Sequence, residues 1–235
     1  MTSFKSIRER AERRKGGAAG LAKLLEPVPP KERLRTIPDD RFLSEMARRV
    51  FSAGFVWSVI DAKWLGFEEA FLGFSPQALL FQPMEFWEAL TSDRRIVRNG
   101  QKIMSVKANA QFILDISREH GSFGAFLADW PSDDQLGLTT LLAKRGSRMG
   151  GNSGQMFLRF VGWDGYVLST DVVSCLKDAG LEIAAPPTSK GDLSKVQAQF
   201  NAWAKESGLP YRHLSRIAAF SIGENYSAEQ TGEEG

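Results

Sequence analysis

The chain has 235 residues, of which 43% are hydrophobic and 25% are charged. This length suits one large domain or two smaller lobes, and the apolar content is sufficient for a packed core. No apolar run reaches the roughly 20 residues that span a bilayer, and the N-terminus lacks the pattern of a secretory signal. The one cysteine, Cys175, excludes an internal disulfide and fits a reducing environment, so we expect a cytoplasmic protein.

The net charge of +2 hides an uneven distribution along the chain. Residues 1–35 carry ten Lys or Arg against four Glu, whereas the last fifteen residues carry four Glu and no basic residue. We therefore predict a basic N-terminal arm or linker over residues 1–37, a helical domain over residues 38–223 and a disordered acidic tail over residues 224–235. Ser6–Lys15 can form a charged helix, but it shows no apolar stripe with which to dock. The arm either contacts nucleic-acid phosphates or is a solvated, frayed terminus.

The helical domain is predicted to begin at Pro38-Asp39-Asp40, where an aspartate can cap the following helix. A helix is predicted from Phe42 to Lys63, because apolar residues recur there at helical spacing. These apolar positions are Leu43, Met46, Val50, Ala53, Gly54, Trp57 and Ile60. Two short helices are predicted over residues 66–73 and 83–92, and a long one over residues 101–119.

Further helical segments are predicted after the long helix. Phe123–Trp130 forms a turn or two, and helices follow over residues 132–145 and 155–161. Two more helices follow the break at Pro186-Pro187, and the second of them begins at Pro210. No segment alternates apolar and polar residues over the length of a strand, so we predict an all-α protein.

A glycine-rich segment, Gly146 to Gly154, joins the predicted helices over residues 132–145 and 155–161. In a helix-hairpin-helix element, such a turn and the N-terminus of the next helix both direct backbone N–H groups at one DNA phosphate. Residues without side chains allow the backbone to approach the duplex closely. The candidate DNA-binding residues are Gly150, Gly151, Asn152 and Ser153. The alternative is an ordinary glycine-rich loop between two helices.

Three collinear stretches resemble 3-methyladenine DNA glycosylase I. The first is Phe51–Trp57, which is similar to the family's Q-x-A-G-L-S-W segment. The second is Ile96–Ile103 with Asn109-Ala110 and Gly121–Leu127, and the third is Leu141–Gly146 with the glycine hairpin. The chain is therefore identified as a divergent member of this family within the helix-hairpin-helix DNA glycosylases. The resemblance implies a two-lobed all-α fold, DNA held at the hairpin, a base pocket between the lobes and excision of alkylated adenine, chiefly 3-methyladenine.

Trp57 matches the family's pocket tryptophan, and the resemblance implies that its ring stacks on a flipped base. The helical register alone favours a core position for Trp57 instead, because it is in phase with Leu43, Met46 and Val50.

The family carries a pocket glutamate in the same helix, and Arg49 stands at that position here. Arg49 is therefore a candidate base-binding residue. Glu45, one turn earlier, is either a candidate catalytic carboxylate at the pocket rim or the partner of Arg49 in a surface ion pair at i,i+4, which the pattern favours. The family's N-terminal segment, around an H-D-x-E-W-G run, is missing.

The family's zinc clip ends in H-x-x-x-C, and the matching run here begins with Asp171 and ends with Cys175. Because the other candidate ligands, His120 and His213, lie elsewhere, we expect no metal and no cofactor. Asp171 is a second catalytic candidate, because the wider superfamily places at a similar spacing an aspartate that stabilises an oxocarbenium-like sugar and positions water. The alternative is that Asp171 is a helix N-cap. Ser153 stands where lyases of the superfamily carry lysine, so we expect no Schiff-base chemistry.

The sequence thus predicts a monofunctional DNA glycosylase of base-excision repair, which hydrolyses the N-glycosidic bond of a flipped alkylated base. We expect a monomer whose partner is damaged DNA. The alternative is a DNA-binding module that retains the hairpin and has lost excision. The replaced glutamate and the missing N-terminal segment favour this alternative, whereas Trp57 and the complete helical body favour the enzyme.

Overall fold

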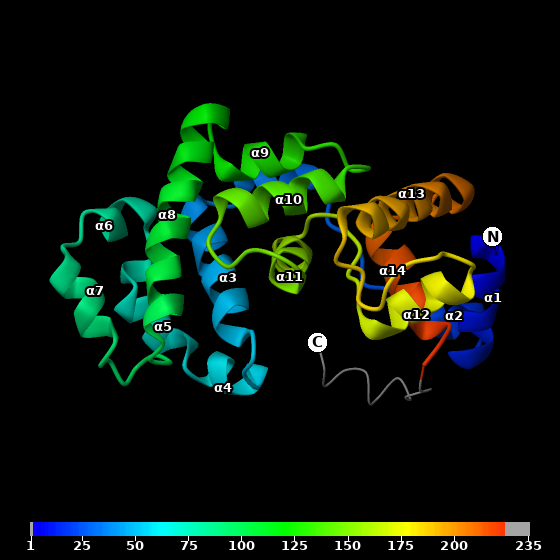
Figure 1. Ribbon diagram of the computed structural model, residues 1–235, viewed down its shortest axis with the longest axis horizontal. Coiled ribbons are helices and arrows are strands. Elements are labelled where there is room, and N and C mark those ends of the chain that lie inside the picture. Colours follow the sequence, from blue (N-terminus) through cyan, green and yellow to red (C-terminus); the bar gives the residue numbers. More distant parts are fainter. Residues whose placement is uncertain (1, 224–235) are drawn as a thin grey trace. The chain divides into compact units, whose positions relative to one another are not determined.

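The computed structural model describes residues 2–223 of the chain, so the predicted acidic tail lies outside the described residues (Figure 1). Within this part the prediction of an all-α protein is confirmed, because the regular elements are α-helices and two short 3-10 helices, η1 and η2. In chain order they are α1 (Phe4–Arg14), α2 (Gly17–Lys23), η1 (Lys31–Thr36), α3 (Asp39–Ser52), α4 (Trp57–Ala62), α5 (Trp64–Ala70), η2 (Leu72–Phe74), α6 (Pro76–Leu80), α7 (Met84–Leu90), α8 (Gly100–His120), α9 (Phe123–Asp129), α10 (Gln135–Arg145), α11 (Asn152–Val161), α12 (Thr170–Asp178), α13 (Lys190–Ser207) and α14 (Tyr211–Phe220). None of these helices is long and apolar enough to cross a membrane.

The described helices form two compact units, each with its own hydrophobic core. Unit 2 comprises residues 30–131 and 137–163, and α8 packs against α3, α6 and α9 within it. Among the described residues, unit 1 joins residues 2–29 with residues 132–136 and 164–223. Its core lies among α1, α12, α13 and α14. Each unit buries a set of aromatic and aliphatic side chains that supplies most of its stability.

The prediction of one continuous helix from Phe42 to Lys63 is wrong. The helix α3 ends at Ser52, and the backbone turns through Ala53 and Gly54 before α4 begins at Trp57. Gly54 has a φ of +78°, a left-handed conformation that glycine adopts without steric cost and that ends the regular helix. Apolar spacing continued across this break and concealed it. Trp57 therefore does not share a helical face with the core residues of α3.

The prediction of an undocked arm over residues 1–37 is also wrong. Phe4, Ile7 and Ala11 form an apolar stripe on α1, and Leu21 continues it on α2; all four side chains are buried in unit 1. Residues 2–29 are thus part of a folded unit, and residues 31–36 form η1 in unit 2. The stripe was overlooked because it begins at Phe4, two residues before the charged run that defined the expected helix.

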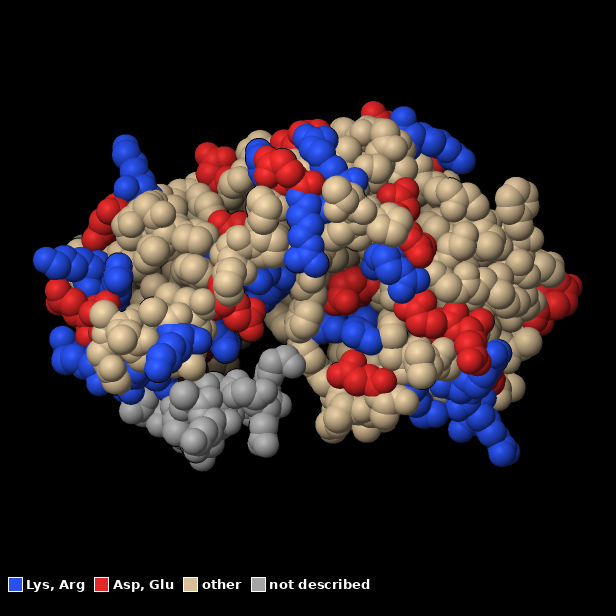
Figure 2. Space-filling model, turned by 180° about the vertical axis from the view of Figure 1, so that it is seen from behind, with Lys and Arg blue, Asp and Glu red and all other residues tan. Residues whose placement is uncertain are grey.

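The basic residues of this N-terminal segment are partly engaged in ion pairs and backbone contacts. Arg10 lies 2.6 Å from the Asp178 carboxylate, and Arg14 donates to the backbone carbonyl of Phe220 at 3.0 Å. On the face drawn in Figure 2, the Lys and Arg side chains of the described residues are interspersed with Asp and Glu. The basic side chains therefore do not form a uniform patch on this face.

Several helix ends differ from the predicted ones. Asp39 is the first residue of α3 rather than its cap, and its carboxylate instead accepts from the backbone N–H of Phe123 at 3.1 Å, at the start of α9. The long helix predicted over residues 101–119 is confirmed as α8. The short helix α6 was not predicted, because five residues show too little periodicity.

Candidate functional site

The side chains of Glu45 and Arg49 form an ion pair on α3. The Arg49 Nε atom lies 2.7 Å from Glu45 Oε1, one helical turn away. The two residues pair as the i,i+4 pattern predicted, but the expectation of a surface pair is wrong, because the side chain of Arg49 is 4% exposed and that of Glu45 is 18% exposed. Both charges are therefore held in a largely desolvated position, where an unpaired ion would be costly.

Two aromatic rings cover the Arg49 guanidinium. Its Cζ atom lies 4.7 Å from the centroid of the Trp57 ring and 3.9 Å from that of Phe160 on α11. The two ring centroids are 5.8 Å apart with an interplanar angle of 55°, so the rings form a corner and not a parallel sandwich. Cation–π attraction stabilises a guanidinium in such a corner. Trp57 is half-buried, and Phe160 is 45% exposed.

Burial controls the ionisation of this pair. It raises the pKa of the Glu45 carboxyl, although Arg49 and Arg48 oppose the effect. It lowers the pKa of Arg49, although the charge of Glu45 opposes that effect. A carboxyl group with a raised pKa exchanges a proton closer to neutral pH than an exposed one, which is the property of a general acid or base.

Three buried atoms of this pair, Arg49 Nε, Arg49 Nη1 and Glu45 Oε1, make no hydrogen bond within residues 2–223, although Nε and Oε1 lie 2.7 Å apart as an ion pair. The Arg49 Nη1 atom is buried and has no hydrogen-bond partner among residues 2–223. A buried donor without an acceptor costs about 1–3 kcal/mol, so this nitrogen is a position at which an acceptor from outside the chain would be stabilising.

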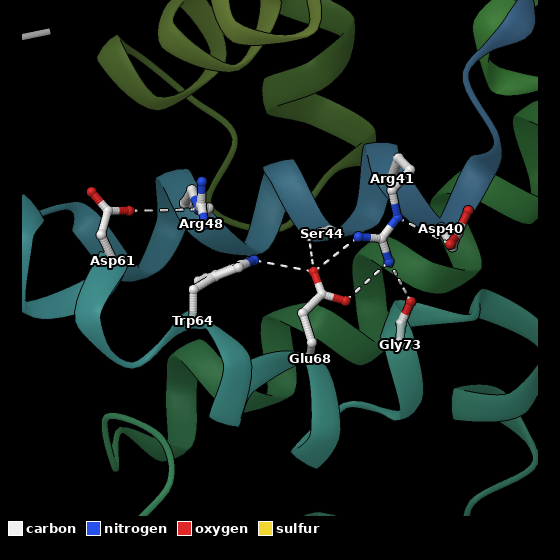
Figure 3. Close-up of polar contacts among 8 residues, drawn as sticks. All are labelled: Asp40, Arg41, Ser44, Arg48, Asp61, Trp64, Glu68 and Gly73. Atoms are coloured by element: carbon white, nitrogen blue, oxygen red, sulfur yellow. Dashed lines mark hydrogen bonds and ion pairs between the residues drawn. The ribbon is translucent and has the colours of Figure 1, made fainter.

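The helix that begins at Trp57 is held against α3 by further contacts. Arg48 lies 3.8 Å from the Asp61 carboxylate on α4, and its guanidinium stacks 4.4 Å above the ring of Trp64, the first residue of α5. The neighbouring side chains of Arg41, Ser44 and Glu68 appear with these contacts in Figure 3. Together they fix α4 and α5 relative to α3.

Glu68 is the centre of this polar network. Its carboxylate accepts from both terminal nitrogens of Arg41, at 2.9 and 3.0 Å, from Ser44 Oγ at 2.8 Å and from Trp64 Nε1 at 3.1 Å (Figure 3). Arg41 also donates to the backbone carbonyl of Gly73 at 2.8 Å. Burial opposes ionisation of Glu68, but these hydrogen bonds outweigh it and lower the pKa. The network joins three helical segments of unit 2.

The predicted hairpin between α10 and α11 is present and is clamped by α8. The Asn109 side chain accepts from the Ser147 backbone N–H at 2.7 Å and donates to the Ser147 carbonyl at 3.1 Å. Met149 is fully buried beneath the turn. An added Cβ at Gly154 would lie 2.5 Å from the Met149 carbonyl oxygen, so glycine is required where α11 approaches the turn. The Asn109 clamp was not predicted, although Asn109 was part of the resemblance.

The four candidate DNA-binding residues lie at the N-terminus of α11. Gly151 is its N-cap, with a φ of +57° and no side-chain hydrogen bond to the helix. Gly150, Gly151 and Asn152 are exposed, and Ser153 is half-buried. An added Cβ at Gly150 would meet only the Ala143 methyl group, at the ordinary contact distance of 3.6 Å. The first turn of α11 thus has no side-chain cap for its backbone N–H groups and starts from exposed residues, as contact with a phosphate requires.

Lys102 on α8 was not predicted to have a role. Its Nζ atom donates to the backbone carbonyls of Phe51 at 3.1 Å and Ala53 at 2.6 Å, and it lies 4.7 Å from the centroid of the exposed Phe55 ring. A lysine at this position satisfies the free carbonyls at the end of α3. It thereby fixes the turn that leads into Trp57. Burial and the charge of Arg148 lower the pKa of Lys102.

Asp171 belongs to unit 1, whereas Glu45, the other catalytic candidate, belongs to unit 2. The alternative of an N-cap role is wrong, because Ser169 is the N-cap of α12 and its Oγ accepts from the Val172 N–H. Asp171 is exposed in the first turn of that helix. A catalytic role for Asp171 stays a prediction. Within residues 2–223, no three His, Cys, Asp or Glu side chains lie close enough together to hold a metal ion.

The arrangement of the helices is similar in fold to that of solved DNA glycosylases. The 8-oxoguanine glycosylase/lyase of Methanocaldococcus jannaschii, solved with a 15mer DNA containing 8-oxoguanine, matches with a TM-score of 0.52 and 12% identity over 92% of this chain and 96% of that chain. The 8-oxoguanine DNA glycosylase of the same organism matches with a TM-score of 0.52 and 14% identity over 91% of this chain and 92% of that chain. These similarities confirm the predicted fold.

Residues 36–141, which are less than half of the chain, match the methyladenine glycosylase family. The 3-methyladenine DNA glycosylase I of Staphylococcus aureus is 23% identical over 54% of this chain and 77% of that chain, with a TM-score of 0.48. No curated protein matches the chain. The resemblance to methyladenine glycosylases is thus confirmed for a segment that contains Glu45, Arg49 and Trp57.

Proposed function

We propose that this protein is a monofunctional DNA glycosylase that hydrolyses the N-glycosidic bond of a flipped, alkylated purine, such as 3-methyladenine or a similar lesion. The observation that carries this proposal is the group formed by Glu45, Arg49 and Trp57. These residues lie together in the segment that matches methyladenine glycosylases, and they combine a half-buried ring with a buried carboxyl group.

The chemistry requires little beyond binding and placement. A purine that is methylated at N3 is cationic and already a good leaving group, so the enzyme must extrude the nucleotide, stack the base and admit a water molecule. Trp57 supplies the stacking surface. A carboxylate stabilises the oxocarbenium-like sugar and directs the water, and the two candidates for this role are Glu45 and Asp171.

The hairpin supplies the hold on DNA in this proposal. The exposed backbone N–H groups at Gly151 and Asn152 bind one phosphate without reading the sequence. Ser153 follows these residues where a lyase would need a lysine, so the product is an intact strand with an abasic site.

A second candidate function is DNA binding without excision. It is favoured by the position of Arg49, because the guanidinium already lies against Trp57, where a base would stack. In this case the hairpin would retain its affinity for DNA, and the ring would stabilise the buried arginine instead of a substrate.

Duplex DNA methylated with dimethyl sulfate separates the two functions. We expect the purified protein to release methylated purines, measured by chromatography, and to leave abasic sites that break only after heating. Glu45→Gln and Asp171→Asn should identify the catalytic carboxylate, because the essential one loses most of its excision rate while the other retains it.

DNA binding with no release above the rate without protein would support the binding module and contradict the enzyme. Strand breaks that appear before heating would contradict a monofunctional reaction.

A further inference from the structure

We infer that the side chain of Arg148, in the turn between α10 and α11, binds a DNA phosphate in addition to the one that the hairpin backbone binds. This inference rests on the proposed function, because it adds a second contact to the same DNA. It is carried by the backbone conformation of Arg148, by the exposure of its side chain and by the absence of an ion pair with residues 2–223.

The backbone conformation of Arg148 disfavours any residue with a side chain. Its φ is +61°, in the left-handed region, where a Cβ atom has a steric cost that glycine avoids. Both neighbours hold it there, because Ser147 forms two hydrogen bonds with Asn109 and Met149 is fully buried. Glycine would therefore suit the fold better at this position, so the stability of the turn does not explain an arginine.

The side chain of Arg148 is also little used within the protein. The residue is exposed, and its guanidinium donates to Gln101 Oε1, a neutral amide oxygen in the first turn of α8. It makes no ion pair with a carboxylate of residues 2–223. Arg145 differs, because its two terminal nitrogens lie 3.1 and 3.0 Å from the Glu119 carboxylate. The charge of Arg148 is thus not neutralised by an ion pair and can serve a partner from outside the chain.

The position of Arg148 indicates that this partner is a phosphate. It stands two residues before Gly150, in the turn that leads to the exposed start of α11. Burial and then the charge of Arg148 lower the pKa of Lys102, the residue that fixes the turn before Trp57, so positive charge gathers on this part of unit 2. Arginine binds phosphate oxygens through strong charge-assisted hydrogen bonds, and such contacts position a protein on DNA without reading its sequence.

Arg148→Gly separates a role in DNA binding from a role in the fold. Glycine removes the side chain together with the steric cost of the left-handed φ, so we expect the unfolding temperature to stay equal or to rise. We expect the Kd for a duplex with one stable abasic-site analogue to increase about tenfold or more at low salt, because one charge-assisted hydrogen bond is lost.

The salt dependence of binding identifies the lost contact as a phosphate. The slope of log Kd against log salt concentration should decrease by about 1 in Arg148→Gly, the change for one phosphate contact. The loss of affinity should be equal in two duplexes of different sequence, because a phosphate contact carries no sequence information.

Three further variants are matched controls. Arg148→Lys retains the charge, and we expect it to retain the salt slope. Gln101→Ala removes the partner of Arg148 within the chain but not the charge, and we expect it to bind DNA like the unaltered protein. Arg118→Ala removes one positive charge near the other end of α8, and we expect the same result because salt screens a charge at that distance.

An unchanged Kd and salt slope in Arg148→Gly would overturn the inference, and so would a loss of affinity that comes with a loss of stability. Neither result affects the proposed function, which is tested by the release of methylated purines from DNA by the unaltered protein. Failure of that release would contradict the proposed function and leave the change in salt slope to be measured on DNA binding alone. Absence of DNA binding by the unaltered protein would overturn both.

Discussion

Trp57 and Trp87 allow a ring exposed at the candidate site to be compared with a ring in the core of the same unit. Trp57 is half-buried at the start of α4, whereas Trp87 is buried in the core of unit 2. We expect Trp57→Ala to reduce the excision rate about 5- to 150-fold, because base–aromatic stacking contributes about 1–3 kcal/mol. We expect Trp87→Ala to reduce the free energy of unfolding by about 3–5 kcal/mol.

Urea unfolding and base release, measured on both variants, distinguish the two kinds of tryptophan. A Trp57→Ala protein that is strongly destabilised, and whose folded fraction excises normally, would show that Trp57 serves the core and not the substrate.

Glu68 provides a pH-dependent test of the polar network. Its pKa is lowered in the folded protein, so its contribution to stability is present above the unfolded pKa near 4.5 and is lost as pH falls through the lower folded pKa. We expect Glu68→Gln to reduce the free energy of unfolding at pH 7 by about 1.5–3 kcal/mol, toward the lower end because Glu68 is partly exposed. Urea unfolding of the unaltered protein and of Glu68→Gln should be measured at pH 7 and at pH 3. We expect the difference between their unfolding midpoints to be smaller at pH 3.

A stability difference that is equal at both pH values would mean that the charge of Glu68 is not what stabilises the network. Ser44→Ala serves as a control, because it removes one neutral donor to Glu68 and retains the ion pair with Arg41.

At the residue scale, the sequence predicted the members of the site that lie on one helix. Glu45 and Arg49 are one turn apart, and their pairing follows from that spacing. Their burial did not follow, because it depends on Phe160, a residue more than one hundred positions later in the chain. Lys102 was not predicted because its hydrogen-bond partners are backbone carbonyls of residues far away in the chain. Such contacts cannot be recognised from the pattern of residue types.

The hairpin is the element whose predicted function can be tested most cleanly. Gly150 is the better of the two glycines for this purpose, because an added Cβ meets only ordinary contact, whereas the positive φ of Gly151 would strain any other residue. We expect Gly150→Asp to weaken DNA binding about tenfold or more, roughly 1.4 kcal/mol, because its carboxylate repels the phosphate.

Gly150→Ala is the matched control, because it adds the methyl group without the charge. Binding should be measured for both variants at one fixed salt concentration, since phosphate contacts weaken as salt rises. Equal affinities of Gly150→Asp and the unaltered protein would place the DNA contact elsewhere.

At the element scale, long helices with uniform apolar spacing were predicted well, and short interruptions were not. The helix α8 agrees with its predicted range within one residue at each end. The break between α3 and α4 was missed, because Ala53, Gly54 and Trp57 continue the apolar spacing while Gly54 takes a left-handed φ. Apolar spacing indicates which residues a helix would bury, but it does not reveal the contacts to backbone carbonyls that end the helix.

The docking of α1 is a property of the whole molecule, because it joins the two ends of the described chain. Phe4 is buried, its ring centroid lies 5.3 Å from that of Trp203, and its backbone N–H donates to Glu206 at 3.0 Å. We expect Phe4→Ala to lower the free energy of unfolding by about 3–5 kcal/mol. The exposed neighbour Lys5 is the control, and Lys5→Ala should change it by no more than about 0.5 kcal/mol.

Thermal or urea unfolding of the two variants checks this prediction. Equal stabilities of Phe4→Ala and Lys5→Ala would mean that the N-terminal helix contributes little to unit 1 and behaves as the free arm that the charge pattern favoured.

The discontinuity of unit 1 has a consequence for how the protein is made. The ribosome makes α1 and α2 well before α12, α13 and α14, which complete their core. The apolar face of α1 therefore stays uncovered until α12, α13 and α14 have been made, whereas all segments of unit 2 are available once residue 163 has emerged. The unit that carries Trp57 and the hairpin can thus fold before all segments of unit 1 have been made.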